Sequence, residues 1–278
     1  EKDFWKCGCT ELKKKIGFIG AGKMAQAMIE GILKTNQIGK ENIMVSAATE
    51  TTIDKIKTNY QITATNDNKR VARFSDILFL AVKPDLHSKI IEEIKSVISQ
   101  DVIIITIAAG ITLADIERDF GFKIKSVRTM PNTPSLVGEG MSAICPNDSM
   151  REEEILEIEY LFHTFSKTER MDEKLMDAIP SISGSSPAYV YMFIEALADG
   201  GVLQGIPRDK AYRLAAQAVL GAAKMVLETG SHPGQLKDNV CTPGGATIEA
   251  VATLEKMQFR GSVLSAMKSC TKKVKSLN

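Results

Sequence analysis

Short apolar runs alternate with segments of helical periodicity over the first half of the chain. The runs at residues 76–82 and 102–107 are apolar almost throughout, which is typical of strands buried on both faces of a parallel sheet. Further strands are predicted at residues 15–19, 42–45, 61–64 and 124–128. Between the strands, two sets of apolar residues recur at helical spacing and predict helices. They are Ala21, Ala25, Met28 and Ile32, and Leu86, Ile90, Ile94 and Val97. Strands that alternate with helices predict an α/β fold with a doubly wound sheet.

Glycines join the first predicted strand to the first predicted helix. Gly20, Gly22 and Ala25 follow the pattern G-x-G-x-x-A. The glycines allow a tight turn and a close approach of the backbone to a pyrophosphate, while Ala25 lets helix and strand pack closely. A plain glycine turn is the alternative, but the following strand completes a βαβ unit. The motif therefore predicts an N-terminal Rossmann domain that binds a dinucleotide at the start of the helix.

The carboxyl ends of the strands indicate where the rest of the cofactor site should lie. Ligands of doubly wound sheets bind beyond these ends. This rule places four further residues on the cofactor side, namely Lys83, Ala108, Ala109 and Asn132.

The end of the second strand bears on the choice of cofactor. NAD enzymes usually carry Asp or Glu there, which binds the ribose hydroxyls. Here the strand ends in Ser46, followed by two alanines and Thr49, and these small residues would tolerate a 2′-phosphate. We therefore expect NADPH to be preferred. NADH remains possible because Glu50 lies close by and no Arg is at hand.

The character of the sequence changes at about Asp172. Strand-like runs disappear, and Ala, Met and Gly become dense. Residues 188–204 are apolar nearly all round, so this predicted helix should be buried in a bundle or a subunit interface. Residues 208–228 are rich in small side chains, which allow close contact between helices. We expect an intertwined homodimer or higher homo-oligomer, with an ordinary intramolecular bundle as the alternative. The predicted organisation is an N-terminal extension (1–12), a Rossmann domain (13–171) and an all-α dimerisation and substrate-binding domain (172–278).

Composition limits the possible partners. The chain has 278 residues with a net charge of +1, so it carries no basic field for nucleic acid. No apolar run is long enough to cross a membrane. The five cysteines are scattered apart from Cys7 and Cys9, and a C-x-C pair without nearby ligands is usually incidental, so no metal site is predicted. A reduced, cytoplasmic protein is expected.

A glycine-containing loop near the C-terminus is the candidate substrate site. Pro243, Gly244 and Gly245 interrupt two helical patterns, with the hydroxyls of Thr242 and Thr247 beside them. A helix start of this kind presents free amides that suit a carboxylate. From spacing alone, a helix-helix corner capped by Thr242 explains the loop equally well.

Taken together, five stretches resemble the pyrroline-5-carboxylate reductase family from about Lys13 to the C-terminus. They are residues 20–22, 81–84, 132–134, 183–189 and 238–247, of which the last is the most specific. The resemblance implies a Rossmann domain followed by a helical domain that interleaves with a partner subunit. It also implies the reduction of 1-pyrroline-5-carboxylate to L-proline, the last step of proline biosynthesis, with NADPH or NADH.

The resemblance also assigns roles to residues. The pyrophosphate would be held by Gly20, Ala21, Gly22, Lys23 and Met24. Asn68 would bind the adenosine side, and the nicotinamide ribose would contact Ala81, Val82, Lys83 and Pro84. The substrate would be received by Thr242, Gly244, Gly245 and Thr247. The sequence departs from the family pattern at three positions, with Lys23 in place of Asn, Ser186 in place of Gly and Thr242 in place of Ser.

The proposed chemistry agrees with the residues available. A protonated cyclic imine is already electrophilic, and hydride addition leaves a neutral amine, so no strong general base is needed. We expect Thr247 to be the catalytic residue, as a hydrogen-bond partner of the ring nitrogen or as a proton donor to it. A related hydroxyacid dehydrogenase would need a general-acid Lys at residues 185–191, where none occurs. A protein that senses NAD(P)H without turnover is the second rival, and a cofactor-oxidation assay separates the two.

Overall fold

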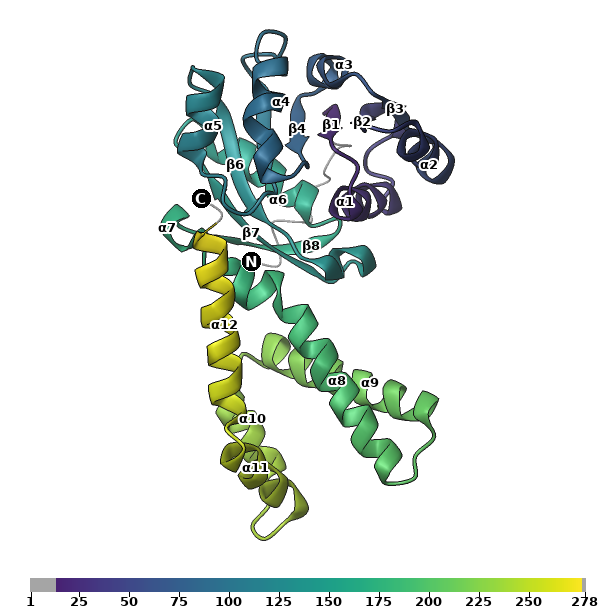
Figure 1. The fold of residues 1–278 in the computed structure, drawn as a ribbon, viewed down its shortest axis with the longest axis vertical. Coiled ribbons are helices and arrows are strands. Elements are labelled where there is room, and N and C mark those ends of the chain that lie inside the picture. Colours follow the sequence, from purple (N-terminus) through teal and green to yellow (C-terminus); the bar gives the residue numbers. More distant parts are fainter. Residues whose placement is uncertain (1–13, 277–278) are drawn as a thin grey trace. The chain divides into compact units, whose positions relative to one another are not determined.

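The computed structural model describes residues 14–276, which form two compact units (Figure 1). The first unit runs to Gly184 and includes the end of the described chain from Thr271, and the second spans Ser185–Cys270. The segment 172–184, which follows the predicted domain boundary, belongs to the first unit. The predicted extension at residues 1–12, with Cys7 and Cys9, lies outside the described residues.

The first unit is built on one sheet. Within the described residues this sheet has eight strands in the order β3-β2-β1-β4-β5-β6-β7-β8. All neighbours are parallel except β6 and β7, which are antiparallel. The strands are β1 (Ile16–Ile19), β2 (Ile43–Ser46), β3 (Thr63–Thr65), β4 (Ile77–Leu80), β5 (Ile103–Thr106), β6 (Lys125–Met130), β7 (Gly140–Pro146) and β8 (Ser166–Arg170). The predicted doubly wound architecture is confirmed, whereas β7 and β8 were not predicted.

Helices cover both faces of the sheet. In β4, Ile77 and Phe79 belong to one hydrophobic core, while Leu78 and Leu80 belong to the other. The first core is closed by α1 (Lys23–Lys34), α2 (Glu50–Tyr60) and α6 (Glu152–Phe162). The second is closed by α3 (Asn68–Phe74), α4 (His87–Ile94) and α5 (Leu113–Phe120). Burial on both faces is the reason why the predicted strand at 76–82 is apolar almost throughout.

Short helical segments complete the first unit. They are the 3₁₀ turns η2 (Lys40–Asn42), η3 (Pro84–Leu86) and η4 (Thr133–Val137), the helix α7 (Glu173–Met176) and the π-turn η5 (Pro180–Gly184). Both η3 and η4 directly follow strands that end at the carboxyl edge of the sheet, so they border the predicted cofactor side.

The second unit is helical. It contains α8 (Ser186–Leu203), α9 (Arg208–Thr229), α10 (Pro233–Val240), α11 (Ala246–Lys256) and most of α12 (Phe259–Lys275). The helices α8 and α9 lie side by side (Figure 1). A single chain nevertheless leaves much of them uncovered, since Ala198 is the buried residue of α8 while Met192 is 70% and Leu203 88% exposed. None of the helices in residues 14–276 has the length and hydropathy that a membrane span requires.

Candidate functional site

Four parallel strands bring the predicted cofactor residues to one edge. Ile19 pairs in register with Leu80, Leu80 with Thr106, and Thr106 with Arg128. The chain segments that follow these residues therefore emerge together. Gly20, the Ala81–Pro84 segment and Asn132 are among them, as the rule for doubly wound sheets predicted.

The turn after β1 requires glycine at position 20. Gly20 has φ +102°, a conformation that L-residues rarely adopt, and its amide donates a hydrogen bond to the Ser46 carbonyl at 3.0 Å. A Cβ atom at Gly20 would lie 2.5 Å from the carbonyl oxygen of Ala81. The turn thus brings the ends of β1, β2 and β4 close together.

The start of α1 is open. Gly22 is the N-cap residue, no side chain caps the helix, and its first turn contains no acidic residue. A Cβ atom at Gly22 would meet nothing within 4 Å, and Lys23 is exposed. The first amides of a helix have no partner within it, and the helix dipole favours an anion there. The geometry therefore fits a pyrophosphate.

Asn68 is held at the start of α3 between two other elements. The Ser46 hydroxyl at the end of β2 donates to Asn68 Oδ1 at 2.7 Å, and Asn68 Nδ2 donates to Glu93 Oε2 of α4 at 3.0 Å. Ser46 is buried, while Asn68 and Glu93 are half-buried. The structure thus joins Ser46 and Asn68, two predicted cofactor residues, and adds Glu93, for which the sequence carries no signal.

The segments after β4 and β6 differ in their surroundings. Lys83 is an exposed N-cap of η3, and Pro84 is the first residue of that 3₁₀ turn. Asn132 is buried, and its side-chain amide forms hydrogen bonds within the protein. It donates to the Ser183 carbonyl at 3.0 Å and accepts from the Met141 amide at 2.9 Å. Asn132 therefore ties η4 to β7 and η5.

His87, at the start of α4, is the histidine nearest to the predicted nicotinamide segment in the sequence. It is 1% exposed, and neither ring nitrogen has a hydrogen-bond partner among the described residues. Burial lowers the pKa of His87 to about 4, although Asp119 opposes the shift. The ring is therefore neutral near pH 7, and it is a residue of the protein interior.

The Thr242–Thr247 loop forms a tight turn into α11. Gly244 has φ +68°, and the Gly245 amide donates to the Thr242 carbonyl at 3.0 Å. The N-cap of α11 is Gly245, which has no side chain, so the alternative in which Thr242 caps the helix is wrong. The first amides of α11 remain available beside the half-buried Thr247. This loop belongs to the second unit, whereas the cofactor residues belong to the first.

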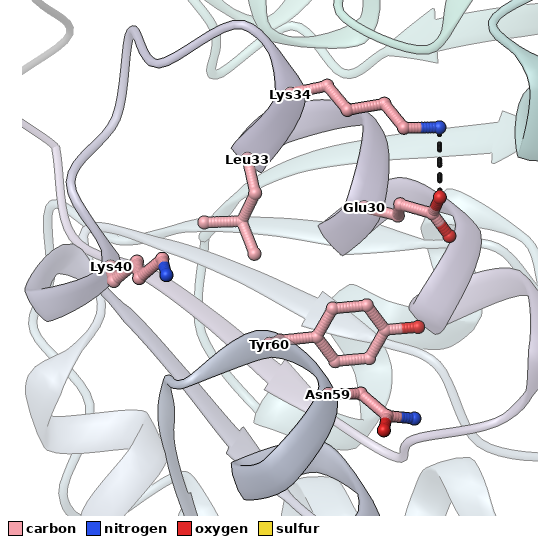
Figure 2. Close-up of a pocket in the computed structure, with 6 residues that line it drawn as sticks. All are labelled: Glu30, Leu33, Lys34, Lys40, Asn59 and Tyr60. Atoms are coloured by element: carbon pink, nitrogen blue, oxygen red, sulfur yellow. Dashed lines mark ion pairs between the residues drawn. The ribbon is translucent and has the colours of Figure 1, made fainter.

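A hollow of about 530 Å³ lies elsewhere on the first unit (Figure 2). It is lined by Glu30, Leu33, Lys34, Lys40, Asn59 and Tyr60. These residues come from the last turns of α1 and α2 and from η2, so the hollow lies at the opposite edge of the sheet from Gly20. Its lysines already have partners, because Lys34 pairs with Glu30 at 2.9 Å and Lys40 donates to Gln61 at 2.6 Å. We do not assign the cofactor to this hollow.

The doubly wound sheet and its glycine turn define a dinucleotide-binding domain of the Rossmann class. Residues 15–110 match the family described as NADP oxidoreductase coenzyme F420-dependent, and residues 173–277 match pyrroline-5-carboxylate reductase dimerisation. The chain is 44% identical to the pyrroline-5-carboxylate reductase of Escherichia coli (strain K12), over 96% of this chain and 99% of that protein. It is 39% identical to the Arabidopsis thaliana enzyme, over 95% of each.

Solved structures of reductases with this name are similar to nearly the whole chain. The Plasmodium falciparum reductase, whose structure has NADP bound, is 34% identical with a TM-score of 0.87, over 96% of this chain and 99% of that one. The Coxiella burnetii reductase is 31% identical with a TM-score of 0.88, over 95% and 98%. The chain belongs to the pyrroline-5-carboxylate reductase family of NAD(P)H-dependent oxidoreductases.

Proposed function

We propose that the chain reduces 1-pyrroline-5-carboxylate to L-proline, with NADPH as the preferred cofactor. The observation that carries this proposal is the glycine turn from Thr242 to Thr247, which opens α11 with free amides and without a capping side chain. The amides suit the substrate carboxylate. The hydroxyls of Thr242 and Thr247 suit the ring nitrogen.

A nicotinamide cofactor supplies the hydride. The residues from Gly20 to Met24 would hold its pyrophosphate at the open start of α1, where even a Cβ at Gly22 meets no atom within 4 Å. Asn68 would face the adenosine side, supported by Ser46. Segment 81–84 would contact the nicotinamide ribose, and Asn132 would shape the same edge.

The residues after β2 support the proposed preference for NADPH. Ala47 and Ala48 carry no carboxylate that would repel a 2′-phosphate. Glu50 is exposed and begins α2, where a negative charge is stabilised by the helix dipole, and Thr49 caps the same helix. Glu50 thus has a structural reason to be there, and NADH remains the alternative cofactor.

Thr247 would act by holding the substrate. The protonated imine becomes a neutral amine without the loss of a further proton, so the protein needs orientation and hydrogen bonding rather than a general base. Thr247→Ala should lower kcat/KM for the imine at least about tenfold, because a hydrogen bond to a charged group is lost. Thr247→Ser, which keeps the hydroxyl, is the matched control and should stay within about threefold. Equal activity of the Ala and Ser variants would remove Thr247 from the mechanism.

We further propose a homodimer formed through the second unit. Its helices leave large apolar side chains exposed in one chain, among them Leu203, Leu214 and Leu227, and apolar surface of this extent is typical of subunit interfaces. Light scattering should give at least twice the mass of one chain. Leu227→Glu should shift the mass towards the monomer, whereas a monomeric unmodified protein would refute the proposal.

The decisive experiment is the oxidation of NADPH and NADH followed by absorbance. It uses 1-pyrroline-5-carboxylate and, in parallel, the six-membered imine that carries the same carboxylate. Turnover of the five-membered imine supports the proposal, and the ratio of cofactor rates tests the preference for NADPH. Cofactor binding without oxidation by either imine would instead indicate a nucleotide-sensing protein.

A further inference from the structure

Glu93 lies outside every motif of the chain, yet it contacts a residue of the cofactor site. It belongs to α4, and its Oε2 atom accepts a hydrogen bond from Asn68 Nδ2 at 3.0 Å. On the other side of Asn68, the hydroxyl of Ser46 donates to Oδ1 at 2.7 Å. One amide side chain therefore connects β2, α3 and α4.

The two contacts determine the orientation of the Asn68 amide. The oxygen and nitrogen of an Asn side chain have nearly the same shape, so a rotation of 180° about the last bond exchanges a donor for an acceptor. A carboxylate can only accept, so the nitrogen of Asn68 must face Glu93. Its oxygen is then directed to Ser46, whose hydroxyl rotates to donate. One N–H and one lone pair of Asn68 remain for a ligand.

The burial of these residues agrees with an indirect role for two of them. Ser46 is 1% exposed, so a ligand on the protein surface cannot reach its hydroxyl without rearrangement. Glu93 is half-buried and directs its carboxylate at Asn68. Asn68, which begins α3, is the member of the three that is suited to meet the cofactor.

We propose that Glu93 is a positioning residue for the dinucleotide, which fixes the Asn68 amide before the cofactor binds. This rests on the proposed function, in which Asn68 faces the adenosine side of the cofactor. Fixing a ligand-binding side chain in advance reduces the entropy lost on binding. The contribution of Glu93 is therefore to cofactor affinity and not to the hydride-transfer step.

The test compares four variants of the full chain with the unmodified protein. They are Glu93→Ala, Glu93→Gln, Asn68→Ala and the double variant Glu93→Ala/Asn68→Ala. Glu92→Gln is the matched control, because Glu92 is the neighbouring residue of the same helix but pairs with Lys95 at the surface. Calorimetry gives the Kd for NADPH and NADH without turnover, and thermal melting verifies folding.

We expect Glu93→Ala to raise the Kd and the KM for both cofactors about tenfold, the upper end of the cost of ordering one side chain on binding. The kcat at saturating cofactor and the KM for the imine should stay within about twofold, because the variant weakens cofactor binding equally in the ground state and in the transition state. Glu93→Gln keeps an acceptor and should restore the Kd to within about threefold of the unmodified protein. Glu92→Gln should change nothing, and Glu93→Ala should have no further effect once Asn68 is Ala.

Several results would overturn the proposal. One is an unchanged Kd in Glu93→Ala. Another is a loss of the same size with and without Asn68, which would mean that Glu93 acts through general stability. Tighter NADPH binding by Glu93→Ala would indicate charge repulsion instead of positioning. If Asn68→Ala leaves the Kd unchanged, Asn68 is not a cofactor residue and the proposal fails with it. A failure to reduce the imine, with the expected changes in Kd, would refute the proposed reaction but not the role of Glu93.

Discussion

Two glycines of the first turn should fail in different ways when each is replaced by alanine. Gly20→Ala introduces a side chain at φ +102° and places its Cβ 2.5 Å from the Ala81 carbonyl oxygen and 2.7 Å from the carbonyl carbon. Gly22→Ala introduces a side chain at φ −68°, an ordinary value, where nothing lies within 4 Å. The same chemical change therefore meets a backbone clash at one position and open space at the other.

The magnitudes follow from these contacts. A non-glycine residue at a sparsely populated positive φ costs about 1–3 kcal/mol, and overpacking against backbone adds about 1–3 kcal/mol. Alanine at position 20 should therefore destabilise the cofactor-free protein by about 3 kcal/mol. For a unit of this size the melting temperature should fall by about 10 °C. Alanine at position 22 should change the free energy of unfolding by less than about 0.5 kcal/mol.

Cofactor binding should show the opposite pattern. If the space at Gly22 receives the pyrophosphate, a methyl group there prevents the close approach of the backbone. Loss of one or two hydrogen bonds to a charged group corresponds to a Kd about 10- to 100-fold higher. Gly22→Ala should thus melt like the unmodified protein and bind NADPH poorly.

Thermal melting of the cofactor-free protein and calorimetric titration with NADPH check the two expectations separately. A melting temperature of Gly20→Ala within about 2 °C of the unmodified protein would contradict the steric argument. Unchanged NADPH affinity of Gly22→Ala would show that the pyrophosphate does not approach this turn.

Two buried charges lead to further predictions. Burial alone would raise the pKa of Glu154, but hydrogen bonds from Arg151 and Lys125 lower it to about 2. A carboxylate whose pKa is lower in the folded state stabilises the protein above the unfolded-state pKa, and this stabilisation is lost as the pH falls through the folded-state pKa. Glu154→Gln should therefore lower the free energy of unfolding in urea by about 2 kcal/mol at pH 7. The difference from the unmodified protein should shrink between about pH 4.5 and 2. Arg128 is 2% exposed and pairs with Asp177, so Asp177→Asn should destabilise the protein by about 3 kcal/mol in the same assay.

Control variants distinguish these effects from a general loss of charge. Asp172 pairs with Lys174 where both side chains are exposed, so Asp172→Asn should cost less than about 0.5 kcal/mol. If Asp172→Asn and Asp177→Asn were equally destabilising, burial of Arg128 would not be the cause. A pH-independent difference between Glu154→Gln and the unmodified protein would exclude the linkage argument.

Two of the strands that the sequence predicted, β4 and β5, are buried on both faces, so hydropathy alone marks them. By contrast, β8 is an edge strand with mostly polar residues. The strand β7 contacts β8 through buried polar side chains, which a hydropathy pattern does not reveal. Ser142 of β7 and Ser166 of β8 are both buried and hydrogen-bonded to each other at 2.8 Å. Each of these serines has its side-chain partner on the other strand, so the reason for its burial is not visible in its own segment.

The candidate site divides in the same way. The sequence by itself determined the glycine turn at Gly20, the open helix start at Gly22 and the glycine corner before Thr247, because the allowed backbone angles of glycine depend on local chemistry. Only the tertiary structure decided that Asn68 donates a hydrogen bond to Glu93 and that Asn132 donates one to the Ser183 carbonyl. Those pairs are 25 and 51 residues apart, and their hydrogen bonds arise from the packing of separate elements. No periodicity along the chain encodes which side chains meet when helices close over a sheet.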